Sequence, residues 1–431
     1  MTSALAGFFG AFALIFFRVP IALSLALVGV LGFAAVSGWN QAFIMLANSA
    51  RDSSMAYGLS VIPLFVLMGN LVAGGGISRE LFTAAQRFLG HRRGGLAVAT
   101  VVACGGFAAV CGSSVATAVT MGKVSLPSMK QYGYSDELST GVIAAGATLG
   151  ILIPPSVIMV IYGILTNTHI GKLYAAGMIP GLIGILLYIV AVQWVVWRKP
   201  GSAPASEKAT FAEKMAALKQ VWAVTLLFML VLGGIYIGWF TATEAAGIGA
   251  SGALILGLLR RRLTIASLKD ILIDTAQTTA VMFALLLGAT AFTEFLNYTG
   301  AHQGLLTLVK GAGVAPFTVI VLIIAIYLVL GCLMESLSMI LLTVPLFFPI
   351  VIGLGYDPVW FGILLVILVE LGLITPPIGV NLFVLRSILP EVPMSTILRG
   401  IIPFIAVDIV RIALIAFFPA ISLFLPNLFF K

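Results

Sequence analysis

Two apolar stretches of this chain of 431 residues contain small and polar residues of the kinds that bind cations. The first contains Gly112-Ser113-Ser114 and the second contains Glu335-Ser336. Unwound backbone offers carbonyl oxygens, and serine hydroxyls and a carboxylate add side-chain oxygens, which suit a hard cation such as sodium. A charged side chain inside an apolar segment is costly and usually has a function. We therefore expect Glu335 to lie in or near a cation site.

Two proline pairs, Pro154-Pro155 and Pro376-Pro377, interrupt other apolar stretches. Each pair removes two backbone N–H donors, so a helix has to break there. Broken helices at matching places in two membrane repeats indicate the binding site of a transporter. The breaks therefore add Ile153, Thr375 and Gly379 to the candidate cation ligands.

Half-helices are predicted to start just after the breaks, at Ser156 and near Asn381. Their positive dipole ends would point inward and would suit an anionic substrate. The candidate substrate residues are Ser156 and Asn381, together with Ser114 at the first tip and Arg386. Helix capping explains Ser156 and Asn381 equally well. For Arg386, snorkelling to the cytoplasmic interface is favoured over a carboxylate clamp.

Five further charged residues lie within apolar segments. Asp408 and Arg411 are three positions apart on one helix face, and we expect them to pair. Glu370 precedes the second proline pair by six positions. It could support a cation ligand without touching the ion, take part in proton transfer, or form a structural hydrogen bond. The sequence assigns no role to Glu244 or Glu294.

A constant offset relates the two sets of motifs. Ser114 and Ser336 lie 222 positions apart, as do the two proline pairs. The chain is therefore close to two copies of one unit, which we place at residues 1–209 and 210–431.

Composition excludes a soluble protein. Hydrophobic residues make up 61% of the chain and charged residues 9%, whereas soluble domains carry about 25% charge. Apolar runs of spanning length recur throughout, which predicts an all-α polytopic membrane protein. The net charge of +8 comes from short loops between spans and does not indicate nucleic-acid binding. The three cysteines and three histidines have no metal-ligand spacing, so we expect neither an enzyme nor a bound cofactor.

Charge also predicts how the two copies are oriented. The segment 78–93 is basic, whereas its counterpart 301–313 is nearly neutral; Arg260-Arg261-Arg262 is basic, whereas its counterpart carries only Arg51. Basic loops are cytoplasmic, so the two copies run in opposite directions through the membrane, as inverted-topology repeats do. The polar linker 198–219 is then cytoplasmic, and both chain termini are expected on the periplasmic side.

Each copy is expected to contain a re-entrant helical hairpin, at about 95–127 and 315–349, and a broken helix, at about 137–165 and 358–388. A small polar turn at the midpoint of a hairpin favours re-entry, because protein or water has to satisfy its backbone. The alternative is two ordinary spans packed through small residues.

Several runs resemble the large membrane subunit of the tripartite ATP-independent periplasmic (TRAP) transporters. They are Gly112 to Thr117, Gly146 to Ser156, Pro63 to Asn70, Thr343 to Leu346 and Leu373 to Phe383. The resemblance covers essentially the whole chain. It implies a sodium-driven secondary transporter of the ion-transporter superfamily in the bacterial inner membrane. The chain differs from the common family pattern at Glu335, where Asp is frequent, and at Arg386, where small residues are common.

The resemblance also implies two partners, a small four-helix membrane subunit (DctQ-like) and a periplasmic substrate-binding protein (DctP-like). The implied substrate is an organic anion such as a C4-dicarboxylate, a keto acid or a sugar acid. Two alternatives are a sodium-coupled dicarboxylate carrier that works alone and, less favoured, an ion channel.

The distribution of candidate ligands predicts how the transporter moves. The hairpins and broken helices hold every candidate ligand, whereas the spans at about 3–37 and 221–259 are continuous and apolar. The segments 78–93 and 301–313 could act as hinged arms. We therefore expect an elevator mechanism, in which the ligand-bearing unit slides across a fixed scaffold.

Overall fold

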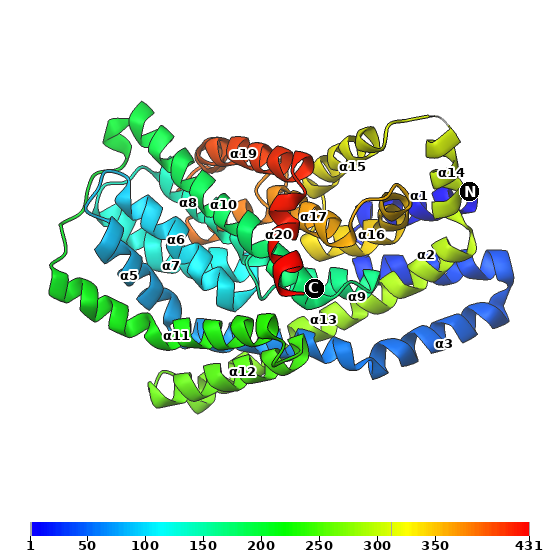
Figure 1. Cartoon of the computed structure of the whole chain (residues 1–431), viewed down its shortest axis with the longest axis horizontal. Coiled ribbons are helices and arrows are strands. Elements are labelled where there is room, and N and C mark those ends of the chain that lie inside the picture. The colour runs from blue at the N-terminus through cyan, green and yellow to red at the C-terminus, as the bar shows by residue number, and fades with distance from the viewer. Residues whose placement is uncertain (1, 312, 431) are drawn as a thin grey trace.

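A computed structural model describes residues 2–311 and 313–430, and helices dominate it from end to end (Figure 1). Seven helices of the described chain are long and apolar enough to cross a membrane, and shorter apolar helices accompany them. The prediction of an all-helical polytopic membrane protein is therefore confirmed.

The first half of the chain contains ten α-helices, with a 3-10 turn before α4 and another after α8. They are α1 (Thr2–Phe16), α2 (Ile21–Ser37), α3 (Trp39–Met55), η1 (Tyr57–Ser60), α4 (Val61–Gly74), α5 (Ile77–Leu89), α6 (Gly95–Cys111), α7 (Ser114–Gln131), α8 (Asp136–Thr148), η2 (Leu149–Ile151), α9 (Val157–Thr166) and α10 (Ile170–Arg198). A short turn η3 (Pro200–Ser202) opens the linker.

The second half follows the same order. Its helices are α11 (Phe211–Ile237), α12 (Ala242–Leu259), α13 (Ile265–Tyr298), α14 (Ala301–Gly311), α15 (Pro316–Gly331), α16 (Ser336–Gly353), α17 (Pro358–Gly372), α18 (Val380–Ile388), α19 (Met394–Phe417) and α20 (Ala420–Phe429). Moved by 222 positions, α7 falls on α16, α8 on α17 and α9 on α18. Of the segment 301–313, residue 312 lies outside the described residues.

The helix pair α6–α7 begins and ends at one face of the molecule. Gly94 N–H, just before α6, donates to Ala203 O at 3.0 Å, and Ser135 N–H, just after α7, donates to Ser202 O at 2.9 Å. Both ends of the pair therefore lie against the linker, while its two-residue turn at Gly112 and Ser113 points inward.

The pair α15–α16 begins and ends at the opposite face. The ring centroids of Phe317, at the start of α15, and Phe417, at the end of α19, are 5.0 Å apart. Trp360 Nε1, at the start of α17, donates to Ile415 O at 2.8 Å. Because the N-terminal part of α19 lies near Lys199 at the linker face, these contacts place α15 and α17 at the other end. Figure 1 shows α5–α7 toward the left and α14–α16 toward the right.

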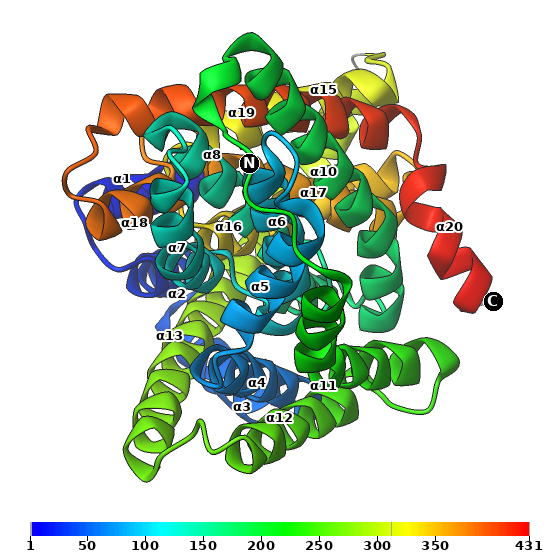
Figure 2. The same cartoon turned by 90° about the vertical axis from the view of Figure 1, so that its left-hand side faces the viewer.

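Long helices from both halves pack in crossed pairs along one side of the molecule. α2 packs on α13, and α12 packs on α4. Under the offset of 222, α2 corresponds to α12 and α4 corresponds to the later part of α13, so the two pairs are equivalent. Figure 2 shows α3, α4, α11, α12 and α13 at one edge of the molecule, apart from the upper group that contains α8, α10, α17 and α19.

The sequence predicts a stretch at 260–274 that is separate from a span at about 275–297, and a single last span at about 398–425, and the structure contradicts both. From Ile265 onward, the first stretch forms the start of α13. Thr264 caps that helix, and no proline or glycine follows before Gly288 to stop it. A single last span at 398–425 is also wrong, since α19 ends at Phe417 and α20 follows. Pro419 explains this break, because the residue before a proline disfavours the helical conformation.

Candidate functional site

A cavity of about 170 Å³ lies where the turns of the two helix pairs meet. Its lining comes from both turns, from the two breaks, and from α4 and α13. The lining residues include Gly112, Ser113, Ser114, Glu335 and Ser336 from the turns, Ile151, Val157 and Leu373 from the breaks, and Val66, Asn70, Thr278 and Met282 from the long helices. The structure thus brings together the two cation-ligand motifs, which lie far apart in sequence.

The two turns present equivalent residues to this cavity. Ser113 is the N-cap of α7, where its hydroxyl accepts from Ala116 N–H at 3.4 Å. Glu335, its counterpart at an offset of 222, is the N-cap of α16, where its carboxylate accepts from Ser338 Oγ at 3.3 Å. Two helix N-termini therefore open on the cavity, with a carboxylate at one of them. A helix N-terminus favours an anion, whereas Glu335 favours a cation.

Each turn rests against the break of its own half. A Cβ on Gly112 would lie 2.8 Å from Pro155 O, and one on Gly150 would lie 2.9 Å from Ser113 O. In the second half, a Cβ on Gly372 would lie 2.6 Å from Gly331 Cα, and Ile378 N–H donates to Cys332 O at 3.3 Å. Glycine allows these backbones to touch, so each turn is in direct backbone contact with the break of its own half.

The candidate residues at the first break serve its local structure. Ser156 is buried and is the N-cap of α9, since its hydroxyl accepts from Met159 N–H at 3.3 Å. The same hydroxyl donates to Ile151 O at 2.5 Å. Ile153 is buried, and its side chain faces Gly105 and Gly181 instead of the cavity.

At the second break, Thr375 is half-buried and its hydroxyl donates to Leu371 O at 2.6 Å. Gly379 has a φ of +52°, a backbone conformation that residues other than glycine rarely adopt. Asn381 is buried and Ser114 Oγ donates to its Oδ1 at 3.5 Å, so it contacts the first turn from the other half of the chain. None of these three residues is among those that line the cavity.

Arg386 lies away from the cavity as well. Its guanidinium donates to the carbonyl oxygens of Leu389 and Pro390, at 3.4 and 2.6 Å, and also to that of Val392. In this structure Arg386 therefore holds the loop between α18 and α19.

Sequence reasoning missed the contribution of the long helices to the cavity. Asn70 and Thr278 are polar, and Asn70 Nδ2 donates to Thr275 Oγ1 at 3.0 Å across α4 and α13. Asn70 stands in one of the runs that resemble the TRAP subunit, which was the one available signal. No pattern in the sequence singles out Thr278.

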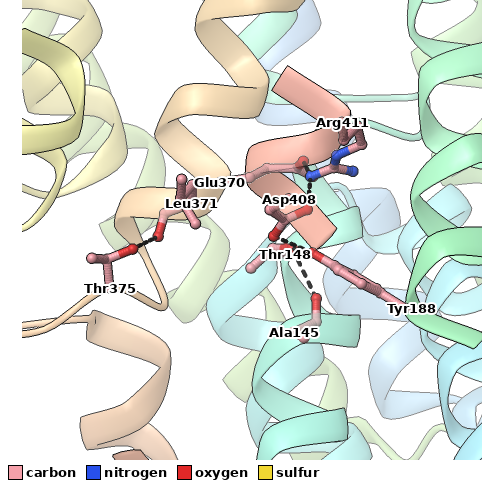
Figure 3. A network of polar contacts seen from close by, with 8 residues as sticks. All are labelled: Ala145, Thr148, Tyr188, Glu370, Leu371, Thr375, Asp408 and Arg411. Carbon is pink, nitrogen blue, oxygen red and sulfur yellow. Dashed lines mark hydrogen bonds and ion pairs between the residues drawn. The ribbon is translucent and has the colours of Figure 1, made fainter. Parts of the chain in front are cut away.

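A second polar cluster is fully buried between α17, α19 and α10 (Figure 3). Arg411 Nη2 lies 2.6 Å from Glu370 Oε2 and 2.8 Å from Asp408 Oδ1. Tyr188 Oη donates to Asp408 Oδ2 at 2.8 Å and lies 3.1 Å from Thr148 Oγ1. The predicted pairing of Asp408 with Arg411 is confirmed, and Glu370 is the second partner of Arg411.

Glu244, which had no assigned role, forms a capping box. Thr241 N–H donates to its carboxylate at 2.8 Å, while Thr241 Oγ1 accepts from Glu244 N–H at 3.3 Å. The Thr-x-x-Glu spacing was the signal for this role. Glu294 lines another cavity with Asp52 and Gln41, between α3 and α13.

Known proteins resemble this chain along nearly its whole length. Residues 8–421 match the family described as "Tripartite ATP-independent periplasmic transporter, DctM component". The C4-dicarboxylate TRAP transporter large permease protein DctM of Pseudomonas aeruginosa is 36% identical over 89% of each chain. The sialic acid TRAP transporter large permease protein SiaM of Vibrio cholerae is 33% identical over 98% of each chain.

Two further matches concern the length of related permeases and the fold. The isethionate TRAP transporter permease protein DctMQ of Oleidesulfovibrio alaskensis is 32% identical over 96% of this chain, which spans 65% of that longer protein. The crystal structure of the YdaH transporter of Alcanivorax borkumensis aligns with a TM-score of 0.65 at 16% identity, over 89% of each chain. At this identity the likeness shows the fold alone.

The family match and the relatives above 30% identity establish what the chain is. It is a multi-pass permease of the bacterial inner membrane and not an enzyme. It belongs to the DctM family, the large membrane component of the tripartite ATP-independent periplasmic transporters.

Proposed function

We propose that this chain is the permease of a sodium-driven importer of an organic anion. The observation that carries the proposal is the cavity in which both helix-pair turns meet. Hydroxyl oxygens of Ser113, Ser114 and Ser336 and the carboxylate of Glu335 are hard donors suited to sodium. The N-termini of α7, α9 and α16 open nearby and favour an anion.

Sodium and substrate would then depend on each other. An anion entering the cavity alone would meet the charge of Glu335, and sodium alone would leave the helix N-termini without an anion. Binding of both together balances the charge, which gives a physical reason for coupled transport. Ser114 could contact either one, because it lies at the turn and also touches Asn381.

We further propose that the two halves are inverted repeats with re-entrant hairpins, with boundaries at 1–209 and 210–431. The support is that α6–α7 departs from and returns to the linker face, whereas α15–α16 does so at the opposite face. The alternation of basic loops between the two halves agrees with this arrangement.

The partners are proposed from the family and the relatives. A TRAP permease works with a small membrane subunit and a periplasmic binding protein, and a relative named DctMQ is longer than this chain. The relatives named for C4-dicarboxylates and for sialic acid favour a carboxylate as the substrate here.

The decisive experiment is uptake into liposomes that contain this chain and its small membrane subunit, with the periplasmic binding protein added outside. The measured substrate is the ligand that the purified binding protein carries. We expect saturable uptake that requires both an inward sodium gradient and the binding protein. Uptake that persists without the binding protein would indicate a carrier that works alone, and single-channel currents would indicate a channel. Uptake that ignores sodium would contradict the coupling.

A further inference from the structure

Two adjoining cavities lie on the outer side of α10 and α19, close to the linker. One, of about 260 Å³, is lined by polar and basic residues that include Arg198, Lys199 and Arg399. The other, of about 320 Å³, is lined by apolar residues that include Val190, Ala406 and Val407. Trp194, Ile402 and Pro403 line both, so the two cavities form one groove with a basic end and an apolar body.

The basic end carries an excess of positive charge. Lys199 Nζ pairs with Glu137 Oε2 at 2.6 Å, and Glu137 lines the same cavity. Within the described residues, Arg198 and Arg399 take part in no ion pair of this kind. The guanidinium of Arg198 instead lies 5.1 Å from the ring centroid of Trp194. Two guanidinium groups at this end are therefore available to an anion.

Helix packing explains why a groove lies here. Gly400 of α19 meets the backbone of Glu137, and Gly141 of α8 meets the backbone of Gly400, so α8 and α19 touch directly. Larger side chains on the exposed face of α10 and α19, such as Trp194 and Ile402, line the groove. Trp194 is 48% exposed and Ile402 61% exposed, so the described part of this chain does not cover them.

We propose that this groove binds an anionic phospholipid of the cytoplasmic leaflet. The headgroup phosphate would bind Arg198 and Arg399, and an acyl chain would lie along Val190, Ile402, Ala406 and Val407. Charge complementarity supports this occupant, because arginine binds phosphate through paired N–H donors and basic pockets between helices at the cytoplasmic side suit anionic headgroups. Trp194 stands between the two parts, as tryptophan does at the membrane interface.

The test is native mass spectrometry of the purified permease, released from nanodiscs of phosphatidylcholine with added phosphatidylglycerol. The wild type should retain phosphatidylglycerol in preference to phosphatidylcholine. Arg198→Gln/Arg399→Gln should weaken that retention roughly tenfold or more, since each basic residue near an anionic headgroup contributes to binding. The matched control is Arg261→Gln/Arg262→Gln, which removes the same charge from another cytoplasmic loop.

A second variant separates a lipid from a free anion. Ala406→Trp fills the apolar body and leaves both arginines in place, so it should also lose phosphatidylglycerol. Retention in Ala406→Trp together with loss in the arginine variant would mean that only an anion binds, which overturns the lipid proposal. Equal losses in the arginine variant and its control, or no lipid preference in the wild type, would overturn it as well. Thermal unfolding in neutral detergent checks that every variant is folded.

Discussion

Ser113 and Glu335 occupy one position in the two halves of the chain, yet they differ in charge. Both cap the helix that follows the turn, and both line the central cavity. An ion site near Glu335 would therefore have a full carboxylate, whereas one near Ser113 would depend on neutral oxygens. An ion bound near Glu335 should for this reason be held more tightly than one bound near Ser113.

Removing these oxygens should weaken sodium activation of uptake. We expect Ser113→Ala, Ser336→Ala and Glu335→Ala each to raise the sodium concentration for half-maximal uptake by roughly tenfold, since a lost contact to a charged group is worth about 1.5–3 kcal/mol. Glu335→Gln should have a smaller effect, because an amide oxygen can still coordinate. The measurement is initial uptake rate against sodium concentration.

The control for lost helix capping is Thr241→Ala, which removes the cap of α12 at a residue that does not line the cavity. Its sodium dependence should match the wild type, and so should binding of the periplasmic partner in all variants. Unchanged sodium activation in both serine variants would remove those residues from the cation sites.

Replacing Arg411 should lower the stability of the protein more than replacing its neighbour Tyr188. It is fully buried between Glu370 and Asp408, so Arg411→Leu leaves two carboxylates without a cation. Breaking such a buried pair costs about 3–5 kcal/mol, whereas Tyr188→Phe removes hydrogen bonds to Thr148 and Asp408, of which the one to the carboxylate is worth about 1.5–3 kcal/mol. Thermal unfolding in detergent should therefore show a larger loss for the first variant than for the second.

A triple variant, Glu370→Gln/Asp408→Asn/Arg411→Met, removes all three charges together. It should be more stable than Arg411→Leu alone, because no buried charge is left unpaired. If the single and triple variants were equally destabilised, lost packing and not charge would explain the effect.

At the scale of elements, proline and repeated motifs made the sequence most informative. The proline pairs fall where α8 and α17 end, and the turns at Gly112 and Glu335 fall at the starts of α7 and α16. Helix continuity was harder to predict, because α13 runs through a polar stretch with only Thr264 to mark its start. The contribution of α4 and α13 to the cavity could not be predicted, since it depends on packing between distant segments.

We expect that glycine at positions 150 and 372 is required for the contact between each turn and the break of its own half. Gly150→Ala and Gly372→Ala place a Cβ within 3 Å of backbone atoms of the turn region in their own half. We expect both to lower the thermal stability and the uptake rate, since backbone cannot move aside as a flexible side chain can.

The matched control is Gly233→Ala in α11, where an added Cβ meets no atom within 4 Å. There alanine should leave stability unchanged or raise it by up to about 1 kcal/mol, because alanine favours a helix. If all three variants behaved alike, the contacts between turn and break would have no special role.

At the scale of the whole molecule, the opposite orientation of the two halves can be tested by labelling. Single cysteines near Arg92 and Arg261 should react only with reagents that reach the cytoplasm, and one near Gly311 only with reagents added outside. Cys332, which is half-buried, is first replaced by alanine. Labelling near Arg92 from outside would contradict the inverted repeat.

The packing also indicates which parts could move past each other. One group consists of the continuous helices α2, α4, α12 and α13, which pack on each other in two pairs. The other group consists of the turns and breaks, which contact each other directly at glycines. The central cavity lies between these two groups, so a sliding movement would carry the cavity residues of the turns along α4 and α13. This arrangement supports the elevator mechanism over a rocking of two halves.

Cross-links between α4 and the first turn test this movement directly. A Cβ on Gly69 would lie 2.6 Å from Cys111 O, so Gly69→Cys and the native Cys111 should cross-link in the state seen here. Because that Cβ also crowds the backbone of Cys111, transport by the oxidised pair is compared with transport by the same variant after reduction. Gly69 lies near the end of α4 that precedes the basic segment 78–93. An outward movement of the turn should therefore bring Cys111 to Phe65 or Ile62, which are about one and two helical turns farther along the same face. We expect the cross-link between positions 69 and 111 to stop transport. The cross-link between 65 and 111, or between 62 and 111, should form only in the opposite state, which sodium and substrate supplied from outside would favour. If the 69–111 cross-link forms in both states while transport continues, the unit does not slide, and a rocking movement has to replace the elevator.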